Sequence, residues 1–120
     1  MAETPEATSL LVKAKTDGLD VRSRDGDNLG HVQAFVVDKR SGQTAYAVLC
    51  LGGFLGMGRS YYPLPFALLA YDAPGDAYVV TIDRRTLEGG PSWANHAPDF
   101  DHAYSDRVSN YYAATSIPLG

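Results

Sequence analysis

The chain has 120 residues, the size of one ordinary domain, and 45% of them are hydrophobic while 20% are charged. Such a composition supports one buried core, and we do not expect two. Ten Lys and Arg against fourteen Asp and Glu give a net charge of −4. No basic run could neutralise a row of phosphates, so we exclude nucleic acid as a partner.

Neither a secretion signal nor a membrane span is predicted. Residues 1–9 lack the positive and apolar regions of a signal peptide, and we expect a flexible tail there. The uncharged stretch between Arg40 and Arg59 is broken by polar residues and glycines, whereas a spanning helix needs about 20 continuous apolar residues. The single cysteine, Cys50, cannot form an intrachain disulfide. We therefore predict a cytoplasmic protein without membrane insertion.

Short β-rich runs separated by turn residues fill most of the chain. The expected strands are residues 10–14, 21–24, 29–38, 44–51, 60–62 and 78–82, with turns at 25–28, 39–42 and 72–76. Within residues 29–38 the bulky apolar side chains are not spaced strictly by two, so we predict a β-bulge there. Residues 44–51 are apolar on both faces, which indicates a central strand.

The sequence pattern changes from strand-like to helical after Asp83. Residues 84–88 predict one helical turn, which Gly89-Gly90-Pro91 ends. Farther on, the apolar residues at helical spacing predict an amphipathic helix from about Asp101 to Ala114; they are Phe100, Tyr104, Val108 and Tyr111 or Tyr112. Several short strands with little helix between them predict a small barrel rather than a doubly wound sheet.

The order and spacing of several short motifs resemble those of bacterial PRC-barrel proteins. These motifs are Leu29-Gly30-His31-Val32, Phe35-Val36-Val37-Asp38, Ser41-Gly42, Tyr46-Ala47-Val48, Gly52-Gly53-Phe54-Leu55-Gly56, Tyr62-Pro63-Leu64-Pro65 and Leu87-Glu88-Gly89-Gly90-Pro91. The family takes its name from the cytoplasmic domain of the photosynthetic reaction-centre H subunit. The resemblance implies a mostly β fold, a small and highly bent antiparallel β-barrel with a short C-terminal helix.

The resemblance covers roughly residues 10–93. We therefore expect residues 1–9 to form a tail, 10–93 the barrel and 94–120 an extension that carries the helix. The family resemblance implies an adaptor or assembly module and no enzyme activity. The chain lacks the membrane helix of the H subunit, so a direct place in a reaction centre is not expected.

Candidate contact residues are large apolar and aromatic side chains. Phe54, Leu55 and Met57 are flanked by glycines at an expected loop tip, where an apolar surface marks a contact site unless it folds back onto the core. The set is completed by Tyr61, Tyr62, Trp93, Tyr111 and Tyr112. The C-terminal aromatics would either cover their own barrel or dock on a second subunit.

No catalytic residue, cofactor site or metal site is predicted. The segment 53–60 differs from a phosphate-binding loop at Arg59, and Tyr61-Tyr62-Pro63 cannot continue as the helix that such a loop requires. Cys50 has no charged sequence neighbour that would activate its thiol, and no serine lies in a nucleophile-elbow pattern. His31 is expected in a strand as a partly exposed sheet residue.

These patterns predict a non-enzymatic protein-binding or assembly module that forms a homo-oligomer. One alternative is a stress-related protein that binds a small ligand or a metal, with His96 and His102 as ligands beside Asp99 and Asp101. Another alternative is an accessory protein of photosynthetic electron-transfer complexes, because of the family resemblance.

Overall fold

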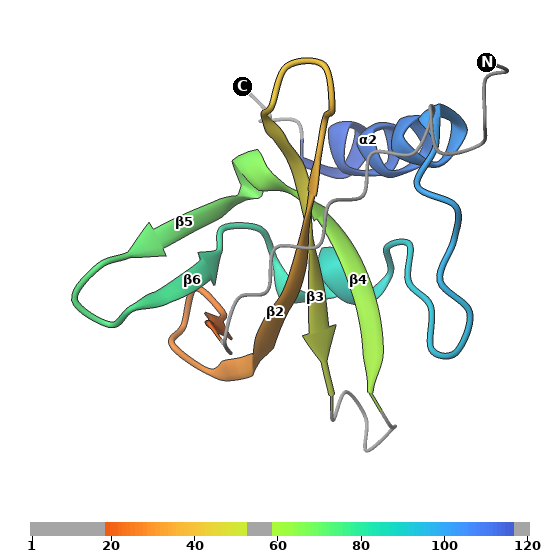
Figure 1. Ribbon diagram of the computed structural model, residues 1–120. Helices are drawn as coiled ribbons and strands as arrows, with labels where there is room; N and C mark the ends of the chain where they lie inside the picture. The colour runs from red at the N-terminus through yellow and green to blue at the C-terminus, as the bar shows by residue number, and fades with distance from the viewer. Residues whose placement is uncertain (1–18, 53–58, 117–120) are drawn as a thin grey trace, which may run out of the picture.

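The computed structural model describes residues 19–52 and 59–116, which form one curled sheet and two helices (Figure 1). The strands are β1 (Asp20–Arg22), β2 (Asn28–Val37), β3 (Thr44–Leu51), β4 (Ser60–Pro65), β5 (Leu69–Asp72) and β6 (Ala77–Val80). A short 3-10 helix, Phe66–Leu68, separates β4 from β5, and the two α-helices are α1 (Arg84–Glu88) and α2 (His102–Ser116). The expected strand at residues 10–14 lies outside the described residues.

The six strands follow the order β4-β3-β2-β1-β6-β5 across the sheet. Four of the five pairings are antiparallel, and β1 with β6 is parallel. The prediction of a mostly β, strongly curled fold with a C-terminal helix is confirmed. The parallel pair had no sequence signal, because four strands lie between β1 and β6 along the chain.

The irregular apolar spacing of β2 comes from a β-bulge, as predicted. Val32 pairs with Leu49 and Ala34 pairs with Val48, so Gln33 is the extra residue in β2. Leu49 and Val48 are consecutive and face opposite sides of the sheet. The bulge therefore places Val32 on one face and Ala34 on the other, although they are two residues apart.

Both faces of β3 are buried, which confirms that it is a central strand. From Tyr46 to Leu51 every residue of β3 is buried. On the inner side of the curled sheet, the ring of Phe35 lies 5.9 Å from that of Phe66 and 6.2 Å from that of Tyr78. The opposite face is covered by the chain after residue 93 and by α2, which lies beside the upper ends of β3 and β4 in Figure 1.

The two edges of the sheet differ. In β4 the N–H of Tyr61 points away from β3 and donates to the Trp93 carbonyl at 2.8 Å. Residues 63 and 65 occupy the same alternate positions and are prolines, which have no N–H to offer. The β4 edge is thus closed, whereas β5 ends the other side of the described sheet without a further strand.

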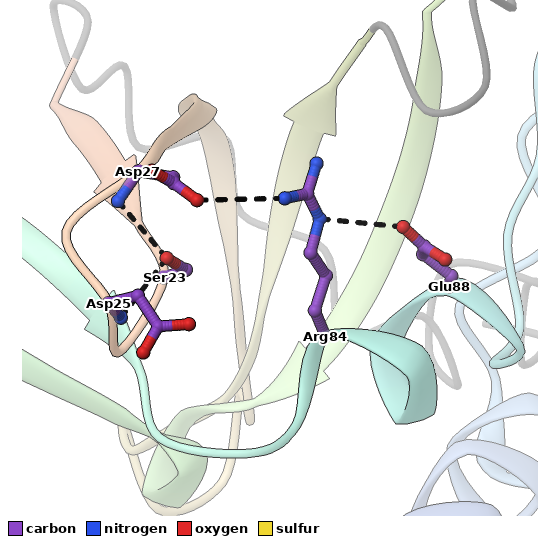
Figure 2. A network of polar contacts seen from close by, with 5 residues as sticks. All are labelled: Ser23, Asp25, Asp27, Arg84 and Glu88. Atoms are coloured by element: carbon purple, nitrogen blue, oxygen red, sulfur yellow. Dashed lines mark hydrogen bonds and ion pairs between the residues drawn. The ribbon is translucent and has the colours of Figure 1, made fainter.

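The β1–β2 turn is tied to α1 at the surface (Figure 2). The Ser23 hydroxyl accepts hydrogen bonds from the backbone N–H groups of Asp25 and Asp27, at 3.2 and 3.1 Å. Arg84 in turn lies 3.8 Å from the Asp27 carboxylate and 3.5 Å from that of Glu88. These ion pairs are exposed, so they orient α1 more than they stabilise the fold.

Among the helices of the described ranges, none has the length and apolar character needed to cross a membrane.

A close contact between β2 and β3 requires a glycine at position 30. Gly30 has a φ of +154°, and a Cβ on it would lie 2.1 Å from the Cys50 carbonyl oxygen. A backbone atom in a central strand cannot move away without disturbing the sheet. Any side chain at position 30 would therefore force β2 and β3 apart.

We predict that Gly30→Ala lowers the free energy of unfolding by about 2–3 kcal/mol, because overpacking and backbone strain act together. Urea denaturation followed by circular dichroism measures the loss. Gly52→Ala is the matched control, since its Cβ would meet Arg59 at ordinary contact distances, 3.4 Å from the side-chain Cγ and 3.9 Å from the Cα. Equal stability of the two variants would contradict the prediction.

Candidate functional site

A two-way backbone bridge fixes one wall of the candidate site. The N–H of Trp93 donates to the Tyr61 carbonyl at 3.0 Å, and the N–H of Tyr61 donates back at 2.8 Å. The two rings stack, with centroids 5.8 Å apart and planes inclined by 24°. The bridge thus turns the chain after α1 back along the closed edge of β4.

From Trp93 a series of rings continues across the outer face of β3. Phe100 lies edge-on to Trp93 at 5.7 Å and edge-on to Tyr104 at 5.8 Å. Tyr46 of β3 contacts both Phe100 and Tyr104, at 6.1 and 6.4 Å between ring centroids. Aromatic pairs at such distances contribute beyond their buried area, so α2 is firmly seated on this face.

Between the sheet and this aromatic segment lies an open cavity of about 270 Å³. Its lining combines three rings with three smaller apolar side chains and one amide; the residues are Tyr61, Trp93, Phe100, Ala34, Val48, Ala97 and Gln33. Gln33 and Ala97 are exposed, and the two rings of the stacked pair are half-buried. The cavity therefore joins the core to the surface.

The bulge in β2 explains the one amide side chain of this lining. As the extra residue, Gln33 lies on the same outer face as Ala34. In a regular strand, two consecutive side chains would face opposite sides of the sheet. Bulges commonly re-aim a side chain next to a functional site. Here the result is an amide at the mouth of a mainly apolar cavity.

The predicted contact residues fall into three groups. Tyr61 and Trp93 line the cavity. Tyr62 and Tyr112 are buried within the core, and Tyr111 is half-buried, with its hydroxyl donated to the Thr86 carbonyl at 2.8 Å. The remaining residues, Phe54, Leu55 and Met57, lie outside the described residues.

The C-terminal aromatics cover their own barrel in this structure. Phe100, Tyr104, Val108 and Tyr112 all belong to the buried core cluster. Tyr46 on β3 also approaches the Ser105 hydroxyl of α2 at 3.4 Å. The amphipathic pattern in the sequence thus located the helix and its buried side.

Two core tyrosines carry hydroxyls that lack partners. Within the described residues, the buried hydroxyl oxygens of Tyr104 and Tyr112 have no hydrogen-bond partner. Burial raises the pKa of Tyr104 to about 12 and also raises the pKa of Tyr112. A Cβ on Gly90 would come within 2.5 Å of the Tyr112 oxygen, so glycine leaves room for that hydroxyl. Both groups stay protonated at neutral pH.

The neighbouring residues Tyr111 and Tyr112 provide a matched pair for mutation. Tyr111→Phe should cost about 1 kcal/mol of unfolding free energy, because the Thr86 carbonyl loses its donor. Tyr112→Phe should be neutral or stabilising, because it removes an unpaired buried hydroxyl. Thermal and urea unfolding of the two variants would show the difference, and the opposite order would contradict this account of the α1–α2 contact.

The sequence analysis missed Gln33, Ala97 and Phe100 as cavity residues. Phe100 was recognised only as part of the helical pattern. The predicted bulge was a usable signal for Gln33, because a bulge changes which side of the sheet a residue faces. Ala97 had no signal, since its role depends on how residues 93–100 fold back over the sheet.

Other candidate sites find no support in the described part of the chain. Cys50 is a buried free thiol within β3. His96 and His102 are both exposed. The described ranges contain no group of three or more His, Cys, Asp or Glu residues arranged to hold a metal ion. The described residues thus give no support to the metal-binding alternative.

The fold and the cavity define a small curled β module with an open cavity lined in part by aromatic rings. The family model for the PRC-barrel domain matches residues 15–87, more than half of the chain. The chain therefore belongs to the PRC-barrel family, which is in general non-catalytic. No curated protein matched the chain.

Proposed function

We propose that this chain is a non-enzymatic protein-binding or assembly module of the cytoplasm, which contacts a protein partner at the cavity of Tyr61 and Trp93. The observation that supports this role is the cavity itself, because it holds half-buried aromatic rings in contact with solvent. Aromatic side chains in a pocket with a polar rim are typical anchors of protein interfaces. Family membership agrees with a binding role rather than a catalytic one.

Ala97 allows this proposal to be tested without touching the core, because it is exposed and lines the cavity. Ala97→Glu places a charge at an apolar contact, which should weaken partner binding by more than about tenfold. Ala113→Glu, on an exposed position of α2, is the matched control.

The measurement is affinity capture from extracts of the native cells, followed by titration of the captured protein. A partner that binds the wild type and the Ala113→Glu variant but not the Ala97→Glu variant supports the proposal. Equal binding by all three proteins would contradict it, provided that circular dichroism shows all three folded.

We also propose that the chain self-associates, through β5. Tyr71 is the exposed large hydrophobic residue of the described chain, with 53% of its surface accessible, and it lies on this terminal strand. Its hydroxyl donates to the Asp76 carboxylate at 2.6 Å, which raises its pKa and holds the ring over the β5–β6 hairpin. Within the described residues no strand pairs with the outer edge of β5, and such an edge beside an exposed ring is a template for pairing with a second strand.

Light scattering gives the test of this second contact. We expect the wild type to have at least the mass of a dimer and Tyr71→Lys to have that of a monomer, because a charged edge residue opposes strand pairing. Tyr71→Phe should keep the wild-type mass, since the ring remains. A monomeric wild type, or a Tyr71→Lys variant of unchanged mass, would contradict self-association through β5.

A further inference from the structure

The lining of the cavity selects against charge. Among its seven lining residues, none has an ionisable acidic or basic side chain other than the weakly acidic phenol of Tyr61. A charged group that entered would lose its hydration without finding a counter-ion, which is strongly unfavourable. The part of a ligand that enters the cavity must therefore be uncharged and mainly apolar.

The size of the cavity limits what can enter. An apolar cavity of roughly 150 Å³ is enough to hold benzene. The present cavity, at about 270 Å³, can thus accept one large apolar side chain but not a packed helix or strand. The occupant is therefore a single residue that projects from a segment lying across the mouth.

The amide of Gln33 fits the backbone of such a segment. A glutamine side chain offers both a donor and an acceptor, and a peptide group offers the complementary pair. Gln33 is exposed, and it lines the mouth of the cavity as the bulged residue of β2. It can therefore bind the main chain of an extended segment whose side chain points inward.

Charge beside the cavity indicates what flanks that side chain. Asp99 is exposed and immediately precedes Phe100 of the lining. The neighbouring Asp101 carboxylate already accepts from the Tyr104 N–H at 2.9 Å, at the start of α2. Since the whole chain carries a net charge of −4, a basic segment is attracted here more than a second copy of this chain.

We propose that the cavity binds an extended segment of a different protein, in which one uncharged apolar side chain of leucine size is flanked by lysine or arginine. The apolar side chain enters the cavity and packs against the Trp93 and Phe100 rings that line it, while Gln33 binds the adjoining peptide group. This assignment rests on the protein-binding role proposed above and specifies the class of partner.

The full chain can be tested with blocked tripeptide amides as probes. Trp93 is the only tryptophan, so the indole N–H signal in an NMR spectrum reports on this cavity alone. We expect Lys-Leu-Lys to shift that signal and to bind at least about tenfold more tightly than Lys-Ser-Lys, because the serine buries little apolar area. Glu-Leu-Glu should bind about two- to fivefold more weakly than Lys-Leu-Lys.

Three variants complete the experiment. Ala97→Phe should abolish binding of Lys-Leu-Lys by filling the cavity, whereas Ala113→Phe should leave it unchanged. Gln33→Met keeps the length of the side chain but removes the amide, and should weaken binding about three- to tenfold. Circular dichroism checks that each variant is folded.

The proposal is overturned if Lys-Leu-Lys leaves the Trp93 signal unmoved, binds no better than Lys-Ser-Lys or Glu-Leu-Glu, or still binds to Ala97→Phe. Unchanged affinity of Gln33→Met overturns the role of that amide. These outcomes are separate from those of the capture experiment. Loss of a captured partner in Ala97→Glu without tripeptide binding refutes the ligand class alone, and tripeptide binding without any partner refutes the proposed function alone.

Discussion

The bend of β2 against β3 is the constraint on which the rest of the structure depends. It requires Gly30, whose missing side chain lets the Cys50 carbonyl approach, and it requires the extra residue Gln33. Past the bulge, β2 turns Ala34 toward the outside while Phe35 points into the curled sheet. One hairpin therefore supplies apolar side chains to two separate layers, which a flat strand of regular alternation could not do.

The second layer explains how so small a sheet buries so much of its central strand. Residues 93–108 cover the outer face of β3 with rings, and the backbone bridge between Tyr61 and Trp93 starts that cover at the closed edge of β4. The cover does not pack completely against the sheet, and the space left is the cavity. The site is thus a consequence of joining a curved face to a short aromatic segment.

Much of this fold could be predicted from local patterns, since β3 and the small helix α1 begin and end where the residue types indicated. The bulge was also predictable, from apolar spacing alone. The site was harder to predict from the sequence than the fold. Adjacent aromatics such as Tyr61 and Tyr62 must face opposite ways in a strand, but only the bridge to Trp93 decides which one is open to solvent. That bridge joins residues far apart in the sequence, and no pattern in the residues next to either of them predicts it.

The division of the cavity between two parts of the chain has a consequence for how such modules diversify. The family match ends at residue 87, whereas Trp93, Ala97 and Phe100 follow it. The contact that we propose could therefore change with this C-terminal wall while the strands of the barrel stay the same. Because the same segment supplies Phe100, Tyr104, Val108 and Tyr112 to the core, a replacement wall would have to fill that core as well as reshape the cavity.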